Sequence, residues 1–281
     1  MYSKFLKQSA TLVCYSCSAV SLAFFVKKEK IRTYCSWTTN IPSIAWDDNW
    51  DFRAPTAIIK PLKEGSSPEK ENEYNEKLEK LKPKASRHFL LIRHGQYNLN
   101  GLTDKERVLT KLGREQAIKT GQRLKELEFP ISQFAISTMT RAQETANLIM
   151  EQLPEKLKFE KIHDSMLEEG AVCKPDPPIE YWNPEEHEFF TEGARIEAAF
   201  RKYIHRADPE QEKDSYTAIV CHGNVIRYFV CRALQLPPQA WLRLGIHHAS
   251  ITWIVVYPSG RVVLRFFGDC GYMPKSHVTQ S

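Results

Sequence analysis

The chain is 281 residues long, with 42% hydrophobic and 26% charged residues and a formal net charge of +5 at pH 7. These fractions are ordinary for a globular protein, so they exclude a chain that is disordered throughout. The charge is mild and no basic run with interleaved aromatic residues is present, so nucleic acid is not an expected partner. The seven cysteines are scattered and odd in number, which favours reduced thiols over a disulfide framework or a metal site.

An uncharged segment near the N-terminus is the first distinct element. Residues 11–26 carry no charge, and five lysines flank them: Lys4, Lys7, Lys27, Lys28 and Lys30. A membrane-spanning helix needs about 20 apolar residues, and residues 8–26 just reach that length. A secretory signal peptide would need a small-residue cleavage site where lysines stand, and a long polar stretch separates the segment from any later core. We therefore expect residues 8–27 to form a single-pass anchor of the weakly hydrophobic mitochondrial kind.

Residues 28–86 are predicted to be a linker that contains a charged helix at 69–81. Two tryptophans lie within five residues of each other in this linker, in the stretch Trp46-Asp47-Asp48-Asn49-Trp50-Asp51. Two interpretations are open for them. They either pack onto the chain's own domain or anchor in another subunit, because tryptophan is a common hot-spot residue at interfaces.

From residue 87 to residue 281 the chain alternates between strand and helix patterns. Strands are expected at 89–92, 133–137, 158–162 and 216–221, and helices at 110–127, 140–153, 192–205 and 225–234, with Thr110 as the N-cap of the first helix. A proline-rich stretch, 164–190, is expected to be irregular, and 250–256 with 261–267 to form a closing hairpin. This order predicts an α/β three-layer sandwich, with a mostly parallel sheet flanked by helices.

Two of the predicted strands end in a histidine followed by a glycine, at His94 and His222. Arg93 directly precedes the first histidine, and Arg141 begins the helix that follows a third strand. Because parallel strands present their carboxyl ends at one edge of a sheet, we expect these four side chains to converge. Two arginines, two histidines and the free N–H groups of a helix start suit a phosphoryl group, without a metal or another cofactor.

The chemistry predicted for this edge is phosphoryl transfer through a histidine. The two arginines offset the phosphate charge, a neutral His94 attacks phosphorus, and His222 holds the transition-state oxygens. A poor leaving group needs a proton, for which Glu168 and Glu169 in the insertion are both candidates. The remaining histidines lack this strand-end context and are interpreted as structural or exposed: His88, His163, His187, His205, His247, His248 and His277.

Four motifs in the same order resemble the histidine phosphatase superfamily, also called the phosphoglycerate mutase-like family. They are Arg93-His94-Gly95, Leu109 to Ala117, Ser137 to Thr145 and His222-Gly223-Asn224. The resemblance implies a catalytic set of Arg93, His94, Arg141, Glu169 and His222, with His94 phosphorylated. It implies that substrate binds to Arg93, Asn100, Arg141 and His222. Glu168 stays an alternative proton donor, because it replaces the arginine that is common before the family's glutamate.

Further segments are similar to the mitochondrial serine/threonine protein phosphatase branch of that family: the tryptophan stretch, 193–200, 231–234 and 268–274. Gln96, where the mutases carry glutamate, also fits this branch. The resemblance implies phosphoprotein substrates and an anchor in a mitochondrial membrane, more often the outer one. It implies a homo-oligomer that raises activity and forms through Trp46, Asp47, Asn49, Trp50 and Asp51. The alternatives are a small-molecule phosphatase or phosphoglycerate mutase, and a non-catalytic mitochondrial scaffold.

Overall fold

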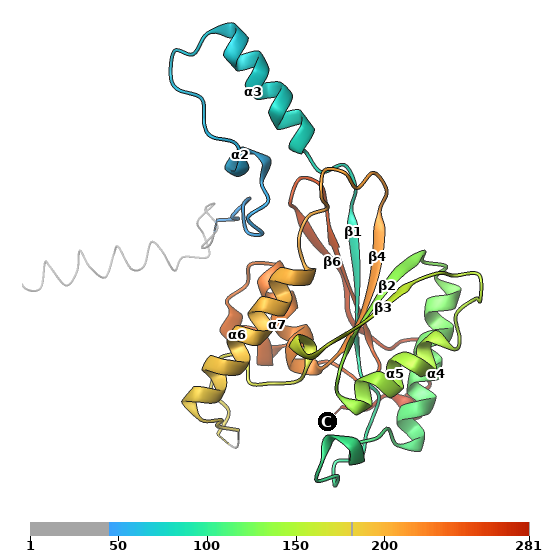
Figure 1. Cartoon of the computed structure of the whole chain (residues 1–281). Coiled ribbons are helices and arrows are strands. Elements are labelled where there is room, and N and C mark those ends of the chain that lie inside the picture. Colours follow the sequence, from blue (N-terminus) through green and yellow to red (C-terminus); the bar gives the residue numbers. More distant parts are fainter. Residues whose placement is uncertain (1–44, 181, 281) are drawn as a thin grey trace, which may run out of the picture. The chain divides into compact units, whose positions relative to one another are not determined.

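The computed structural model of the chain describes residues 45–180 and 182–280 (Figure 1). Its contacts define one compact unit, Asp48–Ser281, and a preceding unit of which only residues 45–47 are described. The anchor predicted at 8–27 lies outside the described residues. Among the helices that are described, none has both the length and the apolar character needed to cross a bilayer.

A six-stranded mixed sheet in the order β3-β2-β4-β1-β5-β6 forms the centre of the compact unit (Figure 1). The strands are β1 (Arg87–Arg93), β2 (Ile131–Ser137), β3 (Glu160–Asp164), β4 (Ser215–Cys221), β5 (Ile251–Val256) and β6 (Val262–Asp269). The first four pair in parallel, β5 runs antiparallel to β1, and β6 runs antiparallel to β5. The predicted α/β fold with a terminal hairpin is thereby confirmed.

Helices cover both faces of this sheet (Figure 1). On one face lie α4 (Lys111–Glu126) and α5 (Thr140–Met150), and on the other α6 (Glu186–Tyr203) and α7 (Gly223–Ala233). The side chains of β1 alternate between the two cores: Leu90 packs on the α4–α5 side and Leu91 on the α6–α7 side. Because both faces are covered, the strand is apolar at every position rather than at every second one.

Local sequence signals account for where two helices begin. The hydroxyl of Thr110 accepts a hydrogen bond from the Gly113 amide at 3.0 Å, which confirms the predicted N-cap of α4. Helix α6 begins at Glu186, six residues earlier than predicted, so the stretch 164–190 is not irregular throughout. The reason is a reciprocal capping box between Glu185 and Glu188, which starts the helix just after the last proline of the insertion.

Four short 3₁₀ helices complete the described chain. They are η1 (Asp104–Glu106), η2 (Ser165–Leu167), η3 (Pro238–Arg243) and η4 (Lys275–His277).

The tryptophan stretch leads into the compact unit, followed by α2 (Pro55–Ile58) and the charged helix α3 (Pro68–Leu81). Trp50 is only 6% exposed: its ring lies 6.1 Å from that of Phe200, and its indole N–H donates to the Gly260 carbonyl at 2.8 Å. Asp51 forms a buried ion pair with Arg206 at 2.9 Å. Of the two interpretations open for this stretch, packing on the chain's own domain therefore describes Trp50 and Asp51. Trp46 is 40% exposed.

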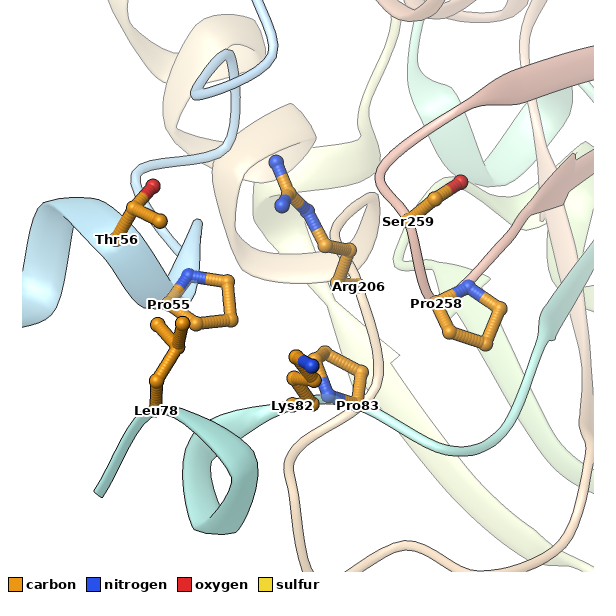
Figure 2. Close-up of a pocket in the computed structure, with 8 residues that line it drawn as sticks. All are labelled: Pro55, Thr56, Leu78, Lys82, Pro83, Arg206, Pro258 and Ser259. Atoms are coloured by element: carbon orange, nitrogen blue, oxygen red, sulfur yellow. The ribbon is translucent and has the colours of Figure 1, made fainter. Parts of the chain in front are cut away.

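A cavity of about 330 Å³ lies between α2, the end of α3 and the turn of the β5–β6 hairpin (Figure 2). Its lining residues are Pro55, Thr56, Leu78, Lys82, Pro83, Arg206, Pro258 and Ser259. The predicted catalytic residues are absent from this lining, so the cavity is separate from the candidate active site.

Candidate active site

His94 directly follows β1 and is 2% exposed. Its Nδ1 lies 2.8 Å from the carbonyl oxygen of Gly95. A carbonyl can only accept, so Nδ1 carries the proton and the lone pair is on Nε2. Burial holds the pKa of this imidazole well below its usual value, and His222, Arg93 and Arg141 act in the same direction. His94 is therefore a neutral imidazole at physiological pH, which is the form that a nucleophile requires.

His222 follows β4, and its ring centroid lies 5.1 Å from that of His94. Its Nε2 is 2.8 Å from the hydroxyl oxygen of Ser137 at the end of β2. Its Nδ1 is buried and has no hydrogen-bond partner in the described part of the chain. When the serine hydroxyl donates to Nε2, the ring proton is on Nδ1, which then offers a donor to a bound oxygen. Burial lowers the pKa of His222 well below its usual value, and the positive charges of Arg141 and Arg93 lower it further.

Two buried arginines supply the positive charge of the site. Arg93 donates to the carbonyl of Ile246 at 2.8 Å, and burial lowers its pKa to about 10, so it stays cationic at neutral pH. Arg141 is 3% exposed and its guanidinium lies 4.8 Å from the centroid of the Tyr97 ring. Its Nε and Nη1 make no hydrogen bond to the described residues; Nη1 lies within ion-pair distance of the Asp104 carboxylate, so Nε is the donor left for an anion.

The start of α5 differs from the expectation of free N–H groups. The amide of Thr140 donates to Oδ2 of Asp104 at 2.9 Å, and its hydroxyl donates to the same oxygen at 2.8 Å. The other carboxylate oxygen lies 3.5 Å from Nη1 of Arg141. The first amide of the helix is therefore occupied, and Asp104 holds the arginine in place. The Thr103–Glu106 capping box predicts the local turn but not this long-range contact.

The two acidic candidates occupy different environments. The carboxylate of Glu168 accepts a hydrogen bond from the Thr138 hydroxyl. Glu169 is partly buried and its charge interacts with Arg141 and Arg93. Burial raises the pKa of Glu169, against the opposing effect of the Gly170 amide and of these two arginines. A raised pKa keeps the carboxyl protonated to higher pH, so Glu169 is the better suited of the two to donate a proton.

Asn100, predicted to bind substrate, lies on the exposed loop that joins Tyr97 to Leu109. Its amide N–H donates to the side-chain oxygen of Asn98 at 3.1 Å. No hydrogen bond joins Asn100 to the buried histidines and arginines in the described part of the chain, so its role in substrate binding stays a prediction.

A third histidine was missed by the sequence analysis. His248 is 3% exposed and its ring centroid lies 5.7 Å from that of His94. Its Nδ1 is 2.9 Å from the hydroxyl oxygen of Thr279, and burial lowers its pKa to about 3. The neighbouring amide of Ala249 donates to the carbonyl of His94 at 3.1 Å. The predicted hairpin could have indicated this position of His248. Its first strand, β5, runs antiparallel to β1, so the residues just before β5 lie beside the end of β1.

Comparisons with known proteins identify relatives of this chain. A family model described as histidine phosphatase superfamily (branch 1) matches residues 89–269. The serine/threonine-protein phosphatase Pgam5, mitochondrial, of Drosophila pseudoobscura pseudoobscura is 51% identical over 266 residues, which cover 92% of this chain and 91% of that protein. The protein of the same name from Drosophila ananassae is 47% identical over 98% of this chain and 96% of its own length. Among solved structures, a phosphoglycerate mutase from Plasmodium falciparum is 34% identical, covers 70% of this chain and 100% of its own, and has a TM-score of 0.48.

Proposed function

Because the chain belongs to branch 1 of the histidine phosphatase superfamily, we propose that it is a protein serine/threonine phosphatase that works through a phosphohistidine at His94. The observation that carries this proposal is the state of His94. It is buried and neutral, its proton is fixed on Nδ1 by the Gly95 carbonyl, and Arg93, Arg141 and His222 surround it. This arrangement leaves Nε2 as the nucleophilic atom in a positively charged site.

In the first half of the reaction, Nε2 of His94 attacks phosphorus and the bond from phosphorus to the serine or threonine oxygen breaks. Glu169 gives its proton to the leaving oxygen, because an alkoxide is a poor leaving group. In the second half, the Glu169 carboxylate takes a proton from water, the resulting hydroxide attacks phosphorus, and the P–N bond breaks to release phosphate. Arg93, Arg141 and His222 offset the charge on the phosphoryl oxygens in both halves.

Two features support a protein substrate over a small sugar acid. The relatives that are about half identical in sequence to this chain are named serine/threonine-protein phosphatases. In addition, Gln96 stands where the mutases carry a glutamate, and its side-chain oxygen accepts a hydrogen bond from the Thr110 hydroxyl at 2.8 Å. A neutral side chain held in this way does not add the negative charge that a glutamate would.

We expect the purified chain to hydrolyse phosphoserine and phosphothreonine peptides. We expect it to leave 3-phosphoglycerate and the corresponding bisphosphoglycerate unchanged. Phosphate release and mutase turnover would be measured side by side, with and without EDTA. Since the two arginines supply the positive charge, we expect EDTA to leave the rate unchanged. Turnover of the sugar acid alone would overturn the choice of substrate, and loss of activity in EDTA would overturn the metal-free mechanism.

The chain is proposed to be anchored by residues 8–27 in a mitochondrial membrane, the outer one in preference. The relatives named as mitochondrial support this, since the match to the Drosophila ananassae protein covers 98% of the chain. In mitochondria, the full chain is expected to stay in the membrane pellet after alkaline extraction. Arginines at Leu22 and Phe24 are expected to move it to the supernatant, since each charge in the apolar segment costs about 3 kcal/mol on insertion scales. Extraction of the unaltered chain would contradict the anchor.

The tryptophan stretch is proposed to support a homo-oligomer through its exposed part. Trp46 is 40% exposed, whereas Trp50 has partners within its own domain. Trp46→Ala is therefore expected to lower the sedimentation coefficient and the activity while the thermal midpoint stays unchanged. Phe52→Ala, which alters an exposed aromatic residue outside the motif, is the control and is expected to sediment as the unaltered protein does. An unchanged sedimentation profile for Trp46→Ala would count against this role.

A further inference from the structure

One guanidinium holds most of the backbone that carries Glu169. Arg195 lies on α6, and its side chain is 22% exposed. Its Nη1 donates to the carbonyl of Met166 at 2.9 Å, that of Glu168 at 2.8 Å and that of Ser165 at 3.3 Å, and its Nη2 donates to the carbonyl of Glu169 at 3.1 Å. Four carbonyls of one short segment thus accept from a single side chain. Of these, the Ser165 carbonyl also accepts from the Glu168 amide at 3.1 Å, so the dependence on Arg195 is greatest for Met166, Glu168 and Glu169.

The arginine is itself held in a fixed orientation. Its Nε donates to the carboxylate of Glu192, one turn earlier on α6, at 3.0 Å. This pairing leaves the guanidinium fork facing the 165–169 segment. A planar fork with several donors can serve several carbonyls at once, whereas the single ammonium of a lysine cannot hold the same set.

Two glycines lie where the insertion meets α6: Gly170 faces the ends of two α6 side chains, and Gly193 faces the backbone of the insertion. A Cβ atom at Gly170 would come within 2.5 Å of the Glu192 carboxylate and 2.8 Å of Nη2 of Arg195. A Cβ atom at Gly193 would lie 2.3 Å from the carbonyl oxygen of Val172. The insertion therefore lies directly on α6 on both sides of Glu169.

On its other side the segment contacts the catalytic edge of the sheet. The side-chain amide of Asn224, two residues after His222, donates to the Gly170 carbonyl at 3.2 Å. The Thr138 hydroxyl donates to the Glu168 carboxylate. Glu169 thus sits between α6 and the strand ends, and the α6 side of that position depends on Arg195.

We propose that Arg195 is a positioning residue for Glu169: by fixing the carbonyls of residues 165–169 it sets the carboxyl where it can protonate the leaving oxygen. Arg195 touches neither the nucleophile nor the substrate in this role. The inference rests on the proposed phosphatase reaction and adds to it the residue on which the proton donor depends.

The test compares two leaving groups. The p-nitrophenolate ion leaves without a proton, whereas a serine alkoxide does not, so only the phosphoserine peptide needs the acid. The comparison uses kcat/KM, because this constant covers the steps up to the loss of the leaving group and omits the second half of the reaction, in which Glu169 acts as a base for both substrates. We expect Arg195→Met to lower kcat/KM on a phosphoserine peptide by about 10- to 100-fold, and kcat/KM on p-nitrophenyl phosphate by less than about threefold. Glu169→Gln is expected to show the same selectivity for the leaving group. Combined with Glu169→Gln, the Arg195→Met change is expected to have little further effect on the peptide reaction.

A pH profile gives a second measure of position. The basic limb of kcat/KM reports the acid of the free enzyme. Burial raises the pKa of Glu169, so a carboxyl released toward solvent loses protons at lower pH. The basic limb on the phosphoserine peptide should therefore move to lower pH in Arg195→Met.

The matched control is Arg232→Met. This change removes a guanidinium on α7 that pairs with Glu197 of α6, the helix of Arg195, and that makes no hydrogen bond to the described residues of the insertion. It is expected to leave the ratio of the two rates unchanged. Arg195→Lys keeps the charge, can be used if the methionine variant does not fold, and is expected to give an intermediate ratio. Equal losses on both substrates, or additivity with Glu169→Gln, would overturn the role of Arg195 and leave the phosphatase proposal standing. Inactivity of the unaltered protein on both substrates would instead overturn the proposed function.

Discussion

Replacement of His94 by alanine is expected to lower turnover of phosphopeptides on the order of 10³-fold or more, as removal of a nucleophile does in other covalent enzymes. The expectation follows from the proton on Nδ1, which is held by the Gly95 carbonyl and leaves Nε2 as the attacking atom. Unlike the leaving-group selectivity expected of the acid, this loss should affect p-nitrophenyl phosphate and phosphopeptides alike.

The covalent step is measured directly by rapid quenching with a radiolabelled phosphopeptide. The unaltered enzyme should retain label that is stable in alkali and released by acid, as a phosphohistidine is, and His94→Ala should retain none. His163→Ala, which removes an exposed histidine on β3, should behave as the unaltered enzyme. Label of equal amount in the His94→Ala protein would refute the phosphohistidine, and the thermal midpoint of both variants checks that each is folded.

Gly113→Ala is expected to destabilise the fold and the active site together. A Cβ atom at this position in α4 would lie 1.9 Å from the carbonyl oxygen of Gln96, two residues after His94. In return, Gly95 faces Gly113 so closely that a Cβ there would lie 2.5 Å from the Gly113 carbonyl oxygen. Either the helix or the nucleophile loop must move, since both contacting groups are backbone. We expect a loss of about 3 kcal/mol in the free energy of unfolding and about 100-fold in kcat.

Thermal unfolding and peptide turnover measure these two effects. A loss of that size corresponds to a fall of about 6 °C in the thermal midpoint for a chain of this length. Gly245→Ala is the matched control, because its Cβ would meet only the end of the Gln280 side chain, at an ordinary 3.6 Å. It is expected to change stability by less than about 0.5 kcal/mol. If Gly113→Ala kept full stability and activity, the close packing of α4 on the nucleophile loop would have no energetic significance.

The elements that the sequence predicted well are those with local causes. The apolar runs before His94 and His222 predict two buried strands, and the rule for parallel sheets then predicts that the two histidines meet. Their ring centroids are 5.1 Å apart. The N-cap at Thr110 is equally local, because its partner lies three residues away.

The features that were not predicted depend on pairings between distant parts of the chain. Asp104 holds the start of α5 across 36 residues, and no local pattern distinguishes it from other exposed acids. His248 lies beside His94 only because Ile92 pairs with Ile251 in the antiparallel register of β1 and β5. Trp50 could be assigned to its own domain only once α6 and the hairpin turn were known to form its site.

The bond between His248 and Thr279 has a practical consequence for anyone who labels the protein. Thr279 also accepts from the side-chain amide of Gln116, whose own oxygen accepts from the Gln96 amide at 2.8 Å. An insertion that displaces Thr279 would therefore break the hydrogen bonds that link it to His248 and Gln116. A better insertion point is the turn at Gly65, between α2 and α3, which has a φ of +77° and no neighbouring atom within 4 Å of a Cβ position.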